Sequence, residues 1–364
     1  MSPLVSRINY IQALIKAKKG FPSVLTSGTV SGSTSVGSTL TYTIATFFGN
    51  PTPTVTYIWY SGVTQVASNV TTYTVQNSDL GNTITVVATA VNSFGTISAT
   101  SNGVAIPIPF ATFTVDIWGG DGGAAYISPG PGSGAGGVGG GFAQGGYARY
   151  QISAPVFASM RFYVGASAGA NSTAPPIGYT RGGITASAGG AGGAGGGGNS
   201  SAIEYAPSPS GPYTWLAVVG GGGGAGVDLN GSYNSGGRGN GYGGGESASG
   251  SGGSQGSPSN GGNGVNSNPQ FSGAGGGGAG GGSAGSGSGG GGGGAGNQNP
   301  AVSIPGGYIN RPSSSTGGSN HPQNSSRSSL NGIDGRIHII TEPGSTIQLD
   351  TGSASYTYPI QSFK

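Results

Sequence analysis

The sequence predicts a mainly β protein, in which a short N-terminal helix precedes two β-sandwiches, the second of which carries a bundle of polyglycine-II helices. Three observations favour this fold class. Apolar residues recur at helical spacing within residues 6–20, whereas residues 22–106 alternate between apolar and polar side chains. Beyond them glycine dominates: the chain holds 83 glycines among 364 residues, concentrated in residues 119–318 and interleaved with strand-like runs.

Residues 6–20 form the predicted helix, with Ser6 as its N-cap and Gly20 just beyond its C-terminal end. A helix of about four turns is marginal alone in water, so its apolar stripe should dock on another surface. That surface is the following domain, a larger assembly or a membrane surface. Our hypothesis is that residues 1–20 attach the protein to a larger assembly, and the residues assigned to this role are Arg7, Ile8, Ile11, Ile15, Lys16, Lys18 and Lys19.

Residues 21–109 are predicted to form an all-β domain. Leu40, Tyr42 and Ile44 alternate with threonines, and turn residues separate this run from the next ones. Several short alternating runs divided by turn signals are typical of a β-sandwich. The apolar positions of the other runs are Val55, Tyr57 and Trp59, and then Ile84, Val86, Ala88 and Ala90.

This domain resembles the bacterial immunoglobulin-like repeats that are common in surface and phage tail proteins. The matching residues are Val36-Gly37-Ser38-Thr39-Leu40, Tyr57-Ile58-Trp59, Asp79-Leu80-Gly81-Asn82-Thr83-Ile84 and Ala90-Val91-Asn92-Ser93. The resemblance implies an immunoglobulin-like β-sandwich that acts as a spacer or as a weak carbohydrate binder. Trp59 is then expected to pack in the core rather than to serve as a ligand platform.

The glycine runs favour a polyglycine-II bundle by elimination. Runs such as Gly220–Gly224 break the three-residue period of collagen, and a β-strand made of glycine is weak. A single three-residue-per-turn extended helix has no internal hydrogen bonds, and ordering each residue costs roughly 1–2 kcal/mol. In a bundle, the missing Cβ atoms let backbones touch, so that N–H groups can bond to carbonyls of neighbouring helices.

Strand-like runs interleave with the glycine runs at residues 113–118, 146–152, 161–164, 201–205, 215–219 and 335–340. The combined pattern resembles the glycine-rich domain of anaplastic-lymphoma-kinase-type receptors. The matching residues are Ile117-Trp118-Gly119-Gly120, Leu216-Ala217-Val218-Val219-Gly220-Gly221-Gly222, Gly306-Gly307-Tyr308-Ile309 and Asn331-Gly332-Ile333-Asp334-Gly335.

That resemblance implies a tumour-necrosis-factor-like β-sandwich with inserted polyglycine-II helices over residues 110–345, followed by a C-terminal tail at residues 346–364. Similar segments occur in phage tail-fibre proteins and adhesins. The receptors also carry cysteines, a membrane span and a kinase, and this sequence shows none of these. The implied fold is therefore retained as an expectation, whereas growth-factor signalling is not.

Charge and composition argue against several classes of function. The formal net charge is +3, but four basic residues lie in residues 1–20 and the remainder is nearly neutral, which argues against nucleic-acid binding. The sequence has no cysteine, and no apolar run approaches the ~20 residues of a membrane span. The first residues lack the charge order of a secretory signal, so we expect assembly in the cytoplasm and release by lysis.

No pattern of titratable residues predicts an enzyme, a metal site or a cofactor. The Gly-x-Gly-x-x-Gly matches are expected by chance at this glycine content, and none opens a helix in a βαβ unit. His321 and His338 have no carboxylate at useful spacing. Asp121 and Asp334 are interpreted as turn residues rather than calcium ligands. The glutamates are scattered between glycine runs, at Glu204, Glu246 and Glu342.

Four aromatic residues stand out in the glycine-rich region because few of their neighbours have large side chains. They either plug the edges of the bundle or form a surface that stacks sugars or aromatic groups of a host. Under the second interpretation the host-contact residues are Tyr233, Tyr242, Phe271 and Tyr308.

Together these observations predict a non-enzymatic structural protein on the virion surface of a tailed phage, at a tail fibre or the capsid exterior. The expected protein is a tail-fibre or adhesin-type component whose glycine-rich head contacts a host surface glycan or protein. It should bind other virion proteins through its N-terminal segment and form a homo-oligomer. A trimer is favoured, because tumour-necrosis-factor-like sandwiches and phage fibres commonly form trimers. The alternatives are a capsid decoration protein and a bacterial cell-surface or matrix structural protein.

Overall fold

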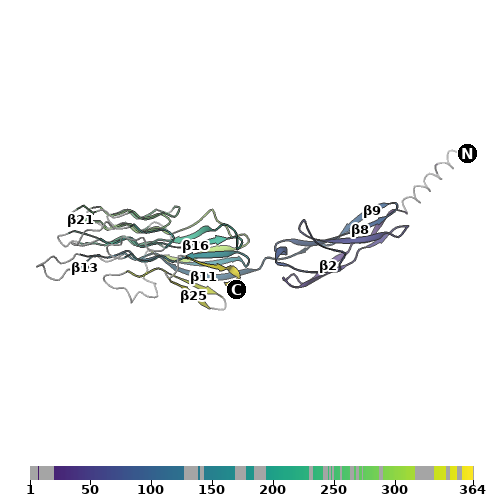
Figure 1. Cartoon of the computed structure of the whole chain (residues 1–364), viewed down its shortest axis with the longest axis horizontal. Coiled ribbons are helices and arrows are strands. Elements are labelled where there is room, and N and C mark those ends of the chain that lie inside the picture. Colours follow the sequence, from purple (N-terminus) through teal and green to yellow (C-terminus); the bar gives the residue numbers. More distant parts are fainter. Residues whose placement is uncertain are drawn as a thin grey trace. The chain divides into compact units, whose positions relative to one another are not determined.

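The computed structural model divides into two compact units, Met1–Pro109 (unit 1) and Phe110–Lys364 (unit 2) (Figure 1). Both are mainly β, as the sequence predicts. The described residues are 7, 20–126, 138–139, 143–168, 178–183, 194–228, 233–240, 245, 247, 250–254, 256–262, 266–267, 270–272, 274–286, 290–315, 332–341, 345–350 and 355–363. The predicted attachment helix therefore lies outside the described residues, apart from Arg7, which is exposed, and Gly20.

Unit 1 contains three antiparallel sheets. The largest has the strand order β10-β8-β5-β6, with β9 also paired to β8; the others are β2-β3-β7 and β1-β4. A 3-10 helix, η1 (Asn77–Asp79), lies between β7 and β8. The strands are β1 (Ser23–Thr26), β2 (Thr29–Gly32), β3 (Thr39–Thr43), β4 (Thr46–Phe48), β5 (Thr54–Ser61), β6 (Thr64–Ser68), β7 (Thr72–Thr74), β8 (Thr83–Asn92), β9 (Gly95–Thr100) and β10 (Val104–Ala105).

The core of unit 1 is built by the alternating residues that the sequence places on one side of each strand. Leu40 in β3 and Ile84 in β8 are fully buried, and their threonine neighbours Thr39 and Thr83 are exposed. Trp59 is buried at the centre of this core, as predicted, and its indole nitrogen donates a hydrogen bond of 2.8 Å to the carbonyl of Val70.

Unit 2 contains two five-stranded antiparallel sheets. The first sheet has the order β23-β14-β11-β24-β25, and the second sheet has the order β22-β17-β16-β15-β26. The strands of the first sheet are β11 (Phe110–Trp118), β14 (Tyr147–Pro155), β23 (Tyr308–Ser315), β24 (Arg336–Thr341) and β25 (Thr346–Leu349). Those of the second sheet are β15 (Ser159–Tyr163), β16 (Ser201–Ala206), β17 (Thr214–Val219), β22 (Asn297–Gln298) and β26 (Tyr356–Pro359).

One hydrophobic core joins the two five-stranded sheets, which is the arrangement of a β-sandwich. Phe113 in β11 and Phe162 in β15 enter it from opposite sheets. The 3-10 helix η3 (Ile360–Phe363) closes the core, because the Phe363 ring lies 4.5 Å from that of Phe113 and 6.3 Å from that of Phe162. Residues 346–364, expected as a tail, thus contribute β25, β26 and η3 to the fold.

The glycine-rich segments extend from one end of these sheets, with the short strands β13 and β21 at their outer end (Figure 1). They include two small sheets, β12-β13 and β19-β18-β21-β20. The strands of these sheets are β12 (Ala125–Tyr126), β13 (Val138–Gly139), β18 (Gly226–Asp228), β19 (Tyr233–Asn234), β20 (Asn266–Ser267) and β21 (Gln270–Phe271).

Most of the described glycine-rich residues lie outside strands, and backbone hydrogen bonds join segments distant in sequence. Residues 220–225 show the pattern most fully, because each N–H donates to one of three neighbouring segments in a three-residue rotation. Residues 220 and 223 donate to the segment 237–240, residues 221 and 224 to 274–277, and residues 222 and 225 to 120–123. The carbonyls of residues 220, 221, 222, 224 and 225 in turn accept from Gly146 and from the segments 195–198 and 291–294.

Residues 220–225 thus exchange hydrogen bonds with six surrounding segments, and we call this packed region the glycine lattice. At many glycine positions the backbones approach so closely that no side chain fits. A Cβ atom added at Gly277 would lie 2.6 Å from the carbonyl oxygen of Thr180, and one at Gly292 would clash with the carbonyl of Ser251. Glycine is required at these two positions by close approach of the backbone.

Candidate functional site

The second sheet of unit 2 carries polar and aromatic side chains on the face turned away from the core. In β15, Met160 and Phe162 enter the core, so the alternate residues of the same strand lie on the outer face. Residues from β16, β17 and two connecting segments join them. We call this set the outer-face cluster, and it consists of Ser159, Arg161, Tyr163, Tyr179, Glu204, Tyr213 and Trp215.

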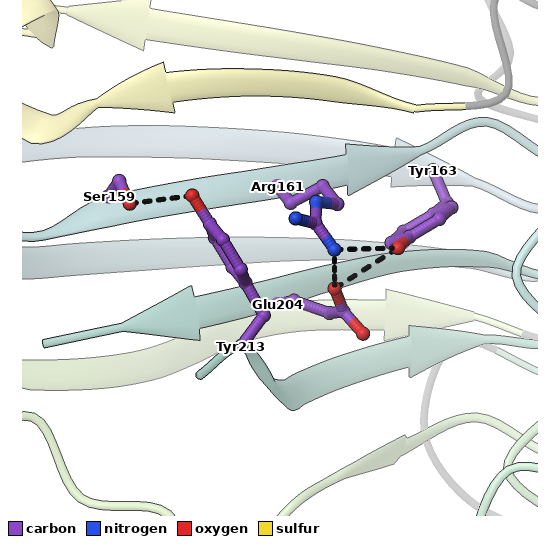
Figure 2. Close-up of polar contacts among 5 residues, drawn as sticks. All are labelled: Ser159, Arg161, Tyr163, Glu204 and Tyr213. Atoms are coloured by element: carbon purple, nitrogen blue, oxygen red, sulfur yellow. Dashed lines mark hydrogen bonds and ion pairs between the residues drawn. The ribbon is translucent and has the colours of Figure 1, made fainter. Parts of the chain in front are cut away.

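An ion pair between Arg161 and Glu204 lies at the centre of the outer-face cluster (Figure 2). The pairing of β15 with β16 places these residues opposite each other. Nη1 of Arg161 donates to Oε2 of Glu204 at 3.3 Å, and the Tyr163 hydroxyl donates to the same oxygen at 3.1 Å. The side chains are 32% and 11% exposed, so the pair is partly removed from water and remains accessible on the arginine side.

Tyr213 extends the cluster through its ring and its hydroxyl. The guanidinium carbon of Arg161 lies 3.9 Å from the ring centroid, which is the geometry of a cation–π contact. The Tyr213 hydroxyl and the Ser159 Oγ share a hydrogen bond of 2.7 Å (Figure 2). This second contact fixes the plane of the Tyr213 ring beside the arginine.

Tyr179 and Trp215 lie where the outer face meets the glycine lattice. With Tyr163 they pack, partly buried, against three fully buried side chains, Ala202, Val218 and Ala279. The rings of Tyr163 and Tyr179 lie 4.9 Å apart. Burial, followed by the nearby Glu204 carboxylate, raises the pKa of Tyr179 above its usual range.

The first sheet carries a separate polar group around Asp116. Nε and Nη2 of Arg149 each donate to its carboxylate at 2.7 Å, and the Tyr147 hydroxyl donates at 2.8 Å. His338 lies opposite Asp116 in the strand register, and its ring contacts Trp118 with centroids 5.3 Å apart. Since arginine and tyrosine hold both oxygens of Asp116, this histidine has a neighbouring carboxylate without the arrangement of a catalytic triad.

The other titratable residues considered from the sequence are dispersed. Within the part of the chain that the structure describes, no group of three or more His, Asp or Glu residues could hold a metal ion. His321, Glu246 and Glu342 lie outside that part. The expectation that the protein is not an enzyme therefore stays a prediction.

Asp121 and Asp334 join distant segments rather than simply ending turns. The Asp121 side chain is almost fully buried, and its two oxygens accept hydrogen bonds of 2.9 Å from the N–H groups of Gly145 and Ile333. Asp334 accepts hydrogen bonds from both the N–H and the hydroxyl of Ser167. Both carboxylates thus tie the glycine lattice to the strands that enter it.

Of the four residues predicted for host contact, the structure describes the strand positions of Tyr233, Phe271 and Tyr308. The backbone pairing of β19-β18-β21 sets Tyr233 and Phe271 opposite the same residue, Val227. Tyr308 is 44% exposed but lies in β23 of the first sheet, opposite Ser153. Tyr242 lies outside the described residues.

Exposed aromatic side chains lie near the start of the β-structure of unit 1, where residues 20 and 21 precede β1. The amide nitrogen of the Asn92 side chain donates to the carbonyl of Gly20 at 2.7 Å. Phe21 and Phe94 pack with their ring centroids 6.2 Å apart, and about half of each side chain is exposed. Phe48 at the end of β4 is exposed as well. We call Phe21, Phe48 and Phe94 the entry collar.

Part of the outer-face cluster is visible in the sequence. Strand alternation in residues 161–164 already places Arg161 and Tyr163 on one face, opposite Phe162. Arginine is uncommon in this chain, so an Arg-x-Tyr pair on a predicted strand stands out. The pairing with Glu204 is not visible, because it depends on the register between β15 and β16.

No protein-family model, curated protein or solved structure matches this chain. Among the described residues, no helix is long and apolar enough to cross a membrane.

Proposed function

We propose that the protein is a non-enzymatic structural component of the virion surface of a tailed phage, of the tail-fibre or adhesin type, that displays its glycine-rich head for host contact. The observation that carries this proposal is the glycine lattice, in which residues 220–225 bond to six surrounding segments. A lattice held by backbone groups is stiff and offers few reactive side chains. It is therefore suited to presenting surfaces and loops for recognition rather than to catalysis.

The proposal includes three assignments of fold. We assign the glycine lattice to polyglycine-II helices, because the three-residue rotation of donors along residues 220–225 matches a helix with three residues per turn. We assign unit 1 to the immunoglobulin-like sandwiches, on the strength of its core around Trp59. We assign the two five-stranded sheets of unit 2 to the tumour-necrosis-factor-like sandwiches, because both sheets share one core.

Attachment through residues 1–20 is supported by the entry collar at the point where that segment joins unit 1. Asp79 is the only charged side chain between residues 21 and 109, and it is fully buried. The surface around the collar therefore carries no formal charge. A partner that holds the N-terminal segment would meet an apolar, uncharged surface at its base, and other virion proteins are the partners we propose.

We further propose a homo-oligomer, with a trimer favoured. Several copies of a weak host contact on one particle act through their effective concentration, so avidity exceeds the affinity of each site. Stiff heads hold those copies at fixed distances, which is the condition under which several contacts can form together.

The test of the proposed location is imaging of intact particles that carry either the full chain or a chain lacking residues 1–20. We expect density for the full chain on the tail or fibre, and loss of that density in the deletion, while the truncated protein stays folded. Full occupancy by the truncated chain would contradict attachment. Density on the capsid shell would identify a decoration protein, and absence of the full chain from particles would favour a bacterial surface protein.

The test of host contact is cell binding by the full-length protein at low and high salt. Because unit 2 has few charged residues, we expect binding that changes little with ionic strength. Absence of binding in both conditions, with the protein folded, would remove the adhesin part of the proposal and leave a purely structural component.

A further inference from the structure

We infer that the outer-face cluster is a binding site for a neutral glycan, with the sugar ring stacked on Tyr213 beside Arg161. The inference rests on the proposed function, since it names the class of host molecule that the head contacts. It adds a compact group on the second sheet to the aromatic residues predicted from the sequence.

Aromatic rings are concentrated in the outer-face cluster. Tyr163, Tyr179, Tyr213 and Trp215 all belong to the cluster, and all four are partly exposed rather than buried. Such rings offer an apolar face together with a polar edge, which suits a ligand that has both C–H and hydroxyl groups. The apolar face of a pyranose ring and its hydroxyls fit this combination.

The position of the ion pair between Arg161 and Glu204 also favours a binding site. Charged residues make up only 6% of the chain, yet Arg161 and Glu204 are placed together on the outer face of a sheet. A partly desolvated pair is weak evidence for stability, because apolar residues of similar volume often stabilise a fold as well or better. A pair retained in such surroundings is better explained by recognition, in which its donors and acceptors meet hydroxyl groups.

The side chains that would bind the sugar are already held in place by contacts with one another. The guanidinium is held over the Tyr213 ring at 3.9 Å, and the ring is held in turn by the hydrogen bond of 2.7 Å to Ser159. Glu204 is fixed by Arg161 and by the Tyr163 hydroxyl (Figure 2). Groups that are already ordered lose little conformational freedom on binding, which favours affinity for a small ligand.

The charge of the site selects the class of glycan. The positive charge of Arg161 and the negative charge of Glu204 cancel, so the cluster has no net attraction for an anion. A sialylated or sulfated glycan would add a negative charge that has to be desolvated beside a pair whose own charges already balance, so it gains little from this site. Neutral oligosaccharides are therefore the expected ligands.

The experiment measures binding of the full-length protein to immobilised neutral oligosaccharides of glucose, galactose, mannose and N-acetylglucosamine, with sialylated and sulfated glycans as a second arm. We expect binding to at least one neutral oligosaccharide. Tyr213→Ser and Arg161→Gln should each raise the Kd at least about tenfold, which corresponds to about 1.4 kcal/mol. Tyr213→Phe retains the ring and should bind within a few fold of the wild type.

The matched control is Tyr60→Ser, which removes a partly exposed tyrosine ring from β5 of unit 1 and should leave the Kd unchanged. Thermal unfolding of each variant checks that the head remains folded. Binding of no neutral glycan, binding of charged glycans only, or equal binding by all variants would overturn the inference. Particle localisation does not depend on this site, so the Tyr213→Ser protein should still occupy particles, and failure of the two proposals can be told apart.

Discussion

Unit 1 and the glycine lattice of unit 2 are both ordered, but side chains hold unit 1 together, whereas the main chain holds the lattice together. In unit 1, large side chains such as Trp59 and Leu40 fill a core between sheets. In the lattice, residues such as Gly221 and Gly277 have no side chain, and direct hydrogen bonds link their backbones. One region depends on burying apolar surface, and the other depends on leaving room for the main chain.

Because of this difference, the two regions should tolerate different substitutions. A core of side chains is damaged when volume is removed, because a cavity remains. A lattice of glycines is damaged when volume is added, because neighbouring backbones cannot separate without losing hydrogen bonds. The comparison therefore predicts opposite responses to small and large substitutions in the two regions.

The largest effect is expected from removing volume in unit 1. Trp59→Ala should destabilise unit 1 by about 3–5 kcal/mol, because the indole is fully buried and contacts Tyr42 and Tyr73. Denaturant unfolding monitored by hydrogen exchange in β8 measures this effect. Trp59→Phe, which retains a ring, should lose much less, and equal losses for the two variants would contradict the packing argument.

Adding a single methyl group to the lattice should have the next largest effect. Gly277→Ala should cost about 1–3 kcal/mol in unit 2, because the new Cβ would lie 2.6 Å from the Thr180 carbonyl oxygen. The matched control is Gly256→Ala, whose Cβ would lie 3.5 Å from the Ala279 carbonyl oxygen, an ordinary contact. Equal melting temperatures for the two variants would show that the lattice is looser than described.

A smaller effect is expected from alkaline pH, and within unit 1 we assign it to Tyr73. Burial, followed by the hydrogen bond to Asp79, raises the pKa of Tyr73 to about 12. The folded state thus holds this proton more tightly than the unfolded state, so stability is present below pH 10 and falls as the pH rises towards 12. We expect a loss of about 1 kcal/mol or less, since the ring is partly solvated.

The variant Tyr73→Phe checks this assignment. Its unfolding free energy should fall less steeply between pH 10 and pH 12 than that of the wild type. An unchanged slope would mean that other tyrosines are responsible for the alkaline response.

The smallest effect is expected from salt. Between residues 21 and 109 only Asp79 is charged, so raising the ionic strength from about 0.01 to about 1 M, which shortens the screening length from ~30 to ~3 Å, has no surface charge pairs to weaken in unit 1. Unit 2 contains the Asp116–Arg149 pair and should lose up to about 1 kcal/mol. Sodium chloride titrations of unfolding compare the two units, and a larger loss in unit 1 would contradict this account.

The strands of both sandwiches could be predicted from the sequence because their side chains report which side of a sheet they face. The alternation at Ile84, Val86 and Ala88 corresponds to fully buried positions of β8, and residues 113–118 form part of β11. The strands β25 and β26 were missed because they lie in residues 346–364, which were assigned to a tail, and because Pro359 within β26 argues against a strand.

Much of unit 2 could not be predicted, for two physical reasons. Glycine has no side chain, so the sequence of residues 220–225 does not indicate which six segments surround them. The outer-face cluster depends on the pairing of β15 with β16, which brings Arg161 and Glu204 together across 43 positions. Local patterns specify strands well, but long-range register decides which side chains meet.

The most direct test of the contrast between the two regions is amide hydrogen exchange of the full-length protein uniformly labelled with 15N. If residues 220–225 are held by backbone hydrogen bonds to six neighbours, their amides should exchange as slowly as those in β11 and β16. If the amide hydrogens of residues 220–225 exchanged at the rate of an unstructured peptide while those of β11 and β16 stayed protected, the lattice would not be held as described. The proposal of a stiff head would then fail as well.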